Sequence, residues 1–75
     1  MKINSALSIA GSDPSSGAGI QADIKIFSSL GVYGCSAITA LTVQNTKEIT
    51  EIFPIPSEIV IKQIKSILAD IKIES

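Results

Sequence analysis

The strongest restriction on the fold comes from a glycine- and serine-rich loop that separates an apolar run from a helical pattern. The run ALSIA, residues 6–10, predicts a short strand that stops at Gly11, and the loop GSDPSSGAG follows it. Pro14 fixes one φ angle of this loop, whereas Gly17 and Gly19 are free to adopt positive φ. A glycine loop between a strand and a helix can hold a ligand against backbone N–H groups, and the residues around it must indicate which ligand.

The rest of the chain alternates between helical and extended patterns. Apolar residues at helical spacing predict a helix from about Gly19 to Leu30, which Gly31 ends. The apolar face of this helix consists of Ile20, Ile24, Phe27 and Leu30. The stretch from Gly34 to Val43 is small or apolar on both faces, which is typical of a central parallel strand. Residues 49–55 predict a short edge strand that Pro54 weakens.

A second helix is expected near the end of the chain. Pro56 and Ser57 open it, with Ser57 as the N-cap and Glu58 at the positive helix start. Its apolar stripe consists of Val60, Ile64, Ile67, Leu68 and Ile71. The final residues, IKIES, predict the onset of another extended segment.

This order of elements predicts an α/β fold with right-handed crossovers. Parallel strands need helices on both faces, and two helices are few for a sheet of this kind. Of the 75 residues, 45% are hydrophobic, and the mean hydropathy is +0.44. A chain this short usually needs a larger polar share to cover itself, so the sequence resembles the interior of a larger domain.

Charge and composition argue against several functional classes. The net charge is −1, the six lysines are scattered and there is no arginine, so nucleic-acid binding is not expected. The single cysteine, Cys35, excludes an internal disulfide and is typical of a reducing cytosol. With no histidine, a transition-metal site is not expected. No signal peptide and no apolar run of about 20 residues are present, so we expect a cytoplasmic protein without membrane contact.

The loop itself matches known phosphate-binding patterns poorly. GAGIQA, residues 17–22, fits the dinucleotide pattern G-x-G-x-x-[G/A], but five residues, Ser12 to Ser16, separate it from Gly11. Gln44 stands where a ribose-binding acid would be expected, and no G-K-[ST] motif is present. The two glycines of this pattern are about equally compatible with a simple turn and with ligand contact.

Two polar residues are candidates for ligand contact. Asp23 lies in the first turns of the helix, where an acid is usually a solvated charge favoured by the helix dipole. Because helical side chains lean toward the N-terminus, Asp23 could instead point at the loop and the carboxyl edge of the sheet. Gln44 is placed at the same edge, either as an ordinary polar strand end or as an amide that pairs with a ring nitrogen and its neighbouring amino group.

Three other residues are expected to have structural roles. Asp13 is expected to cap the Pro14 turn, Cys35 to be a small buried hydrophobe and Tyr33 to be a packing residue.

Residues 6–46 resemble the N-terminus of the hydroxymethylpyrimidine/phosphomethylpyrimidine kinases, a thiamine-pathway family of the ribokinase-like superfamily. The motifs that carry the resemblance are AGSDPSSGAGIQAD, LGVYGCS and ITALTVQNT, and the similarity continues more loosely to the end of the chain. Ser16 departs from the family, which usually has glycine at this position. The resemblance implies a three-layer ribokinase-like fold with a mainly parallel sheet. Residues 1–75 would then be the N-terminal β-α-β-(β)-α part of a single, longer kinase domain.

The resemblance also implies a function for the glycine loop, as a wall for the substrate pyrimidine and not as a phosphate cradle. The implied contacts come from the Gly11 backbone, Asp23 and Gln44. ATP, Mg²⁺, the anion hole and a catalytic cysteine that Cys35 does not match would belong to the C-terminal part. No catalytic residue is therefore expected in this chain, and the chain alone is expected to be inactive.

The full-length form would be a homodimer that phosphorylates 4-amino-5-hydroxymethyl-2-methylpyrimidine and its monophosphate. The alternatives are a pyridoxal kinase-like enzyme and a non-catalytic remnant that binds a small molecule or packs on another chain.

Overall fold

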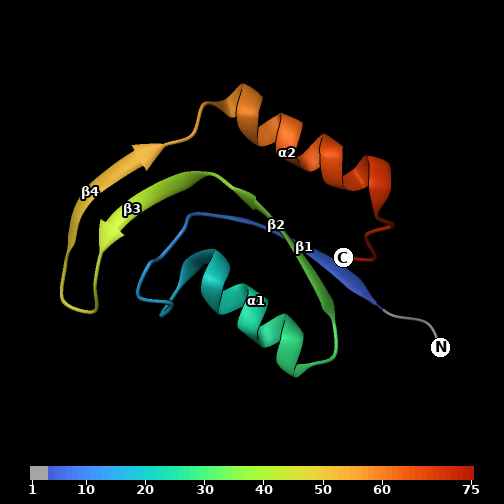
Figure 1. Cartoon of the computed structure of the whole chain (residues 1–75), viewed down its shortest axis with the longest axis horizontal. Helices are drawn as coiled ribbons and strands as arrows, with labels where there is room; N and C mark the ends of the chain where they lie inside the picture. Colours follow the sequence, from blue (N-terminus) through green and yellow to red (C-terminus); the bar gives the residue numbers. More distant parts are fainter. Residues whose placement is uncertain (1–3) are drawn as a thin grey trace.

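The computed structural model describes residues 4–75 and contains four strands and two helices in this part (Figure 1). In chain order the elements are β1 (Ser5–Ala10), α1 (Gly19–Ser29), β2 (Tyr33–Ile38), β3 (Ala40–Gln44), β4 (Ile49–Pro54) and α2 (Ser57–Asp70). All of these elements were predicted from the sequence except the division of one predicted strand into β2 and β3.

A parallel strand pair forms the centre of the molecule. β1 and β2 pair in register from Ser5 opposite Tyr33 to Ala10 opposite Ile38. α1 covers one face of this pair and α2 lies on the other face, so the layers are helix, sheet and helix (Figure 1). On the free edge of β1, the Leu7 N–H donates to the Ser75 carbonyl and the Ser75 N–H donates to the Ser5 carbonyl. This is the parallel pairing pattern, and it confirms the extended segment expected at IKIES.

α1 packs closely against the sheet because Gly34 has no side chain. A Cβ atom at Gly34 would lie 2.8 Å from Cδ2 of Phe27 and 3.0 Å from Cδ1 of Ile24. The helix ends at Ser29, and Gly31, predicted to stop it, follows the C-cap residue Leu30 with φ +71°. The N–H groups of Gly31 and Val32 donate to the carbonyls of Ser28 and Phe27, which is the Schellman arrangement. Leu30, predicted to be on the apolar face, lies one residue beyond the end of α1 and is 71% exposed.

The strand predicted from Gly34 to Val43 is wrong as a single element, because the chain changes sheets at Thr39. The Thr39 N–H still donates to the Ala10 carbonyl, but the Thr39 carbonyl accepts from Ile55. The Ala40 carbonyl accepts from the Ser12 N–H. These bonds turn the backbone out of the parallel pair and into an antiparallel hairpin with β4.

The β3–β4 hairpin extends past the carboxyl ends of β1 and β2 and curves around the glycine loop (Figure 1). Its register shifts between Val43 and Gln44, where Thr50 is the extra residue of β4. The Thr50 hydroxyl donates to the Val43 carbonyl at 3.0 Å, next to this bulge. β4 is exposed along its whole length, in agreement with the predicted edge strand.

α2 differs from expectation at its start, where Pro56 and not Ser57 is the N-cap residue. Pro56 has an extended ψ of 138°, so Ser57 already belongs to the first turn and makes no capping hydrogen bond. Glu58 lies in the first turn, as expected. The Gln63 side chain binds both the N–H and the carbonyl of Ile38, at 2.9 Å each, and so holds α2 against the outer edge of β2.

The buried core is small. Its hydrophobic members are Ala6, Ile20, Cys35 and Ala37. Cys35 is a free, buried thiol, as predicted, whereas Tyr33 is 57% exposed and is not the packing residue that we expected. Leu68, predicted on the apolar stripe of α2, is also exposed. None of the helices in residues 4–75 is long and apolar enough to cross a bilayer.

Candidate functional site

Asp13 organises the glycine loop through its carboxylate. Oδ1 accepts hydrogen bonds from the N–H and the hydroxyl of Ser15, at 2.9 and 2.6 Å. Oδ2 accepts from the N–H groups of Gly17 and Ala18, at 3.0 and 2.9 Å. Asp13 is only 4% exposed, and the hydrogen bond from the Ser15 hydroxyl is the main cause that lowers the pKa of its carboxyl group below the ordinary value. Its expected role as the cap of the Pro14 turn is confirmed.

These bonds limit what the loop can hold. The N–H groups of Ser15, Gly17 and Ala18 are the donors that a glycine-rich loop could present to a phosphate. The Asp13 carboxylate already occupies all three of them. The loop geometry therefore disfavours phosphate binding by these N–H groups and is compatible with a loop that forms one wall of a binding site.

The backbone of the loop differs from expectation at one residue. Gly19 has a positive φ of +65°, as expected, but Gly17 does not have a positive φ. The neighbouring Ser16 has φ +63° instead, although it carries a side chain. Asp13 explains this arrangement, because its carboxylate pulls the N–H groups of Gly17 and Ala18 inward.

Residues from α1 and β3 fix the loop from outside. The Gln21 side chain accepts from the Asp13 N–H at 2.7 Å and donates to the Ser12 hydroxyl at 2.7 Å. The Thr42 hydroxyl donates to the Ser12 carbonyl at 2.7 Å. Sequence reasoning missed Ser12, Gln21 and Thr42 as supports of the site. The position of Gln21 in the first turn of α1, next to the loop, was the available signal.

Gly11 lies where the loop, α1 and β3 meet. Its carbonyl accepts from the Ile20 N–H at 2.9 Å, and a Cβ at Gly11 would lie 3.7 Å from the Ala40 carbonyl oxygen. A Cβ at Gly19 would overlap the Gly11 carbonyl oxygen. Among residues 4–75, none accepts a hydrogen bond from the Gly11 N–H. This N–H is thus a donor that a ligand could use.

Asp23 extends from α1 to the neighbouring strand of the sheet. Its Oδ2 accepts from the hydroxyl of Ser8 at 2.6 Å, and Ser8 is a buried residue of β1. Asp23 is half-buried and is therefore not the freely solvated charge that a helix start would favour. In the described part of the chain, Oδ1 of Asp23 has no donor, so this oxygen can accept a bond from a ligand.

Gln44 occupies a different place from the one predicted. It does not end the second parallel strand but ends β3, in the hairpin, because the chain leaves the parallel pair at Thr39. Ala40, Thr42 and Gln44 alternate with exposed residues and are half-buried, so they share the face that Thr42 turns to the loop. The Gln44 side-chain amide has no partner among residues 4–75.

The three predicted site residues therefore come from three parts of the chain: Gly11 from the loop, Asp23 from α1 and Gln44 from the end of β3. No hydrogen bond of the described residues joins Gly11, Asp23 and Gln44 directly. Within residues 4–75, each of them nevertheless retains a polar group without a partner, whereas Asp13, Gln21 and Thr42 are paired.

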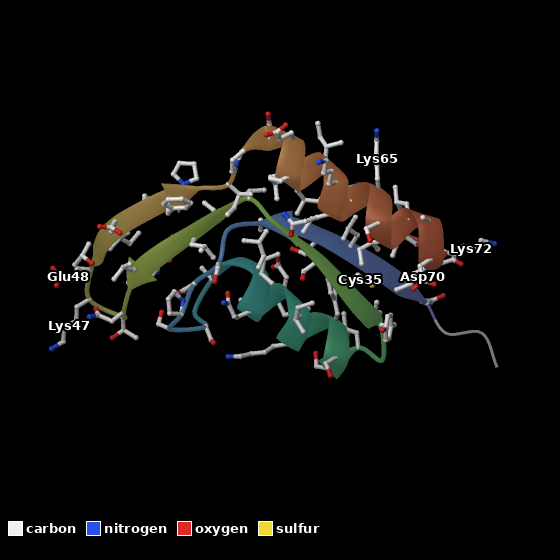
Figure 2. The ribbon with its side chains drawn as sticks, turned by 45° about the horizontal axis from the view of Figure 1, so that its top comes forward. Cys35, Lys47, Glu48, Lys65, Asp70 and Lys72 are labelled. Carbon is white, nitrogen blue, oxygen red and sulfur yellow. The ribbon has the colours of Figure 1, made fainter. Side chains whose placement is uncertain are left out.

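Other surface features have no hydrogen bond to Gly11, Asp23 or Gln44 among residues 4–75. A cavity of about 410 Å³ lies at the amino end of β1, and Asn4, Leu30 and Val32 contribute to its lining. Figure 2 shows Lys47 and Glu48 at the tip of the hairpin and Lys65 on the outer side of α2. Residues 4–75 contain no group of three or more His, Cys, Asp or Glu side chains that could hold a metal ion.

Comparison with known proteins gives consistent similarities. A family model described as phosphomethylpyrimidine kinase matches residues 13–75. The hydroxymethylpyrimidine/phosphomethylpyrimidine kinase of Escherichia coli (strain K12) is 52% identical over 75 residues, which are 100% of this chain and 28% of that protein. The chain thus spans little more than a quarter of the length of this relative.

Solved structures extend the similarity to the fold. The crystal structure of a phosphomethylpyrimidine kinase from Clostridium difficile 630 matches with a TM-score of 0.90 and 50% identity, over 99% of this chain and 32% of that chain. The pyridoxal kinase from Staphylococcus aureus in complex with AMP-PCP and pyridoxal matches with a TM-score of 0.79 and 38% identity, over 91% of this chain and 26% of that chain. The expected three-layer α/β fold with a parallel sheet is confirmed.

Proposed function

The chain belongs to the phosphomethylpyrimidine kinase family, and we propose that it forms the pyrimidine-holding part of such a kinase. The reaction is transfer of a phosphoryl group from ATP to the hydroxymethyl group of 4-amino-5-hydroxymethyl-2-methylpyrimidine, and then to its monophosphate, in thiamine biosynthesis. The observation that carries this proposal is the set of polar groups at Gly11, Asp23 and Gln44 that have no partner among residues 4–75. They accompany a loop in which Asp13 already binds the N–H groups of Ser15, Gly17 and Ala18.

Each of the three groups has a distinct role in this proposal. The Gln44 amide combines a donor and an acceptor, which match a ring nitrogen and the adjacent 4-amino group of the pyrimidine. Oδ1 of Asp23 accepts a hydrogen bond from the substrate, while Ser8 holds Oδ2. The Gly11 N–H donates from the loop wall. In this arrangement the chain orients the acceptor alcohol, and positioning of this kind is a large part of phosphoryl transfer catalysis.

We assign no role in ATP or Mg²⁺ binding to residues of this chain. The N–H groups of Ser15, Gly17 and Ala18 in the glycine loop are occupied by Asp13, and the described residues offer no cluster of metal ligands. The proposal places ATP and Mg²⁺ on the remainder of a family-length kinase, which supplies the charge stabilisation of the transition state. We also propose that this complete kinase is a cytoplasmic homodimer, and the free, buried thiol of Cys35 supports a reducing compartment.

A hybrid kinase tests the function. Residues 1–75 of this chain replace the matching part of the Escherichia coli relative, to which they are 52% identical. We expect ATP-dependent phosphorylation of the pyrimidine by the hybrid kinase and none by the 75-residue chain alone. A folded hybrid without activity would contradict the proposal and favour the non-catalytic alternative. Sedimentation of the hybrid kinase tests the proposed dimer.

A pyridoxal kinase is the second candidate function. The specific observation in its favour is the fold match to a pyridoxal kinase solved with pyridoxal, at 38% identity. The higher identity to the Escherichia coli relative favours the pyrimidine. The ratio of kcat/KM for the two alcohols, measured on the same hybrid kinase, discriminates between them. A ratio in favour of pyridoxal would reverse the assignment.

A further inference from the structure

Asp13 is a buried acid that the proposed reaction does not use. Its two oxygens accept four hydrogen bonds, three from backbone N–H groups and one from the Ser15 hydroxyl. Hydrogen bonds to an ionised acceptor are about twice as strong as bonds between neutral groups. A single carboxylate therefore fixes most of the loop between Pro14 and Ala18.

The residues that Asp13 holds are those that lead into α1. Gly17 and Ala18 come directly before the first helical residue, Gly19. The following N–H, of Ile20, donates to the Gly11 carbonyl. The conformation that Asp13 imposes thus determines how α1 meets Gly11, and with it the place of the free Gly11 N–H.

The main chain of Asp13 is fixed independently of its carboxylate. Its N–H donates to the side chain of Gln21, which also donates to the Ser12 hydroxyl. The Ser12 N–H and carbonyl are bonded to Ala40 and Thr42 of β3. Removal of the carboxylate would therefore leave the first part of the loop attached to α1 and β3 and would release the N–H groups of Ser15, Gly17 and Ala18. Ser16 would stay tethered, because its N–H donates to the Asp13 main-chain carbonyl and its carbonyl accepts from Lys25.

We propose that Asp13 is a positioning residue whose carboxylate acts as a resident anion, holding the loop in its substrate-receiving form before the substrate arrives. The carboxylate takes the place that a bound anion has in other glycine-rich loops. The loop is then already ordered without a ligand, so substrate binding carries no conformational-entropy cost for ordering the loop. The consequence for the substrate rests on the function proposed above, whereas the effect on the loop does not.

Chemical rescue separates this role from a general contribution to stability. In Asp13→Ala the N–H groups of Ser15, Gly17 and Ala18 lose their acceptor and surround a space of carboxylate size. We expect amide hydrogen exchange of Gly17 and Ala18 to become about tenfold faster or more, because the charge-assisted bonds are lost. Formate should return the exchange rate toward that of the unaltered chain, and chloride at the same ionic strength should not.

The measurement is hydrogen–deuterium exchange with mass spectrometry on the 75-residue chain, because this method tolerates self-association of the protein. Asp70→Ala is the matched control, because it removes the same charge from an exposed site at the end of α2. Peptides from β2 report whether the fold is retained. Unchanged exchange at Gly17 and Ala18 in Asp13→Ala, or equal rescue by chloride and formate, would overturn the proposal.

Asp13→Asn decides the case if Asp13→Ala unfolds the chain. Asparagine has a single acceptor oxygen. If this oxygen accepts from Ser15, the NH2 group faces the N–H donors of Gly17 and Ala18, and if the side chain is turned the other way, Ser15 loses its acceptor. Exchange should therefore be faster in part of the loop and should not respond to formate, because the space is filled. Exchange as slow as in the unaltered chain would refute the resident-anion role.

In the hybrid kinase, Asp13→Ala should raise the KM for the pyrimidine, formate should lower it again, and the KM for ATP should stay unchanged. If the loop responds to formate but the unaltered hybrid kinase shows no pyrimidine activity, the proposed function fails and the role of Asp13 stands. If the hybrid kinase is active but Asp13→Ala leaves its pyrimidine KM unchanged, the positioning role fails and the proposed function stands.

Discussion

The buried hydroxyl of Ser8, in β1, donates a 2.6 Å hydrogen bond to Oδ2 of Asp23, in α1. This bond holds one oxygen of the carboxylate against the sheet, while the other has no donor among residues 4–75. It also converts Asp23 from an ordinary acid near a helix start into a group with a fixed direction. Ser8 was not identified from the sequence, because a serine in a short apolar strand carries no signal of its own.

Replacement of Ser8 by alanine should release Asp23. We expect the KM of the hybrid kinase for the pyrimidine to rise about 3- to 10-fold, since the bond to a charged group that orients Asp23 is lost. Steady-state kinetics with both substrates measure this effect. Ser36→Ala is the matched control, because Ser36 is the register partner of Ser8 on β2 and has no bond to Asp23. Equal effects of the two substitutions would refute the orienting role of Ser8.

Gln44→Ala should weaken pyrimidine binding far more than ATP binding. Unpaired ring and amino groups in a desolvated site cost about 1–3 kcal/mol, or about 5- to 150-fold in affinity. The KM for the pyrimidine and the KM for ATP should be measured on one preparation of the hybrid kinase. Lys47→Ala, at the exposed tip of the same hairpin (Figure 2), is the control. If both constants rise equally, or neither changes, Gln44 is only a polar strand end.

The position of Gln44 shows where sequence reasoning reaches its limit. Residues 34–43 are small or apolar throughout, and no glycine or proline marks the change of sheet at Thr39. The division into β2 and β3 depends on hydrogen bonds from Ser12 and Ile55. Both residues are distant from Thr39 in the sequence, so the pattern of apolar residues does not reveal these bonds. The same limit applies to Gln21 and Thr42, whose partners in the loop are defined only by the folded backbone.

The loop was more predictable than the hairpin, because glycine, proline and aspartate restrict the backbone locally. Asp13 was correctly interpreted as a cap, and Gly19 and Gly31 as positions suited to positive φ. The exception is Gly17, which was expected to be free to adopt a positive φ, whereas the adjacent Ser16 has the left-handed conformation. Ser16 adopts that conformation because the Asp13 carboxylate requires the N–H groups of Gly17 and Ala18 to point inward.

The two glycines of the G-x-G pattern should therefore respond differently to alanine. Gly19→Ala places a Cβ at positive φ against the Gly11 carbonyl oxygen, which belongs to the backbone and cannot move aside. We expect a loss of about 2–4 kcal/mol in the free energy of unfolding of the hybrid kinase. Gly17→Ala, whose nearest contact would be 3.7 Å, should change it by less than about 1 kcal/mol. Urea titration tests both, and comparable losses would contradict the assigned roles.

The 75-residue chain should self-associate when it is studied alone. Large apolar side chains are exposed on both faces of the hairpin, among them Leu41, Val43, Ile52 and Phe53. Within residues 4–75, β4 is paired only with β3, so its other edge presents backbone groups that favour strand addition. Sedimentation should give a mass well above the 7.8 kDa of one chain. A monomer with a sharp, concentration-independent thermal transition would contradict this expectation.

Ser16→Gly should stabilise the protein. Ser16 has φ +63°, a conformation that costs a residue with a side chain about 1–2 kcal/mol and costs glycine nothing. Part of this gain is offset because glycine loses more backbone entropy on folding, so we expect the free energy of unfolding of the hybrid kinase to rise by up to about 1 kcal/mol. Ser66→Gly is the matched control, because the same substitution inside α2 should lower this free energy by about 0.5–1 kcal/mol. The urea midpoints of the two variants should thus move in opposite directions. A decrease for both would mean that the left-handed conformation of Ser16 carries no strain.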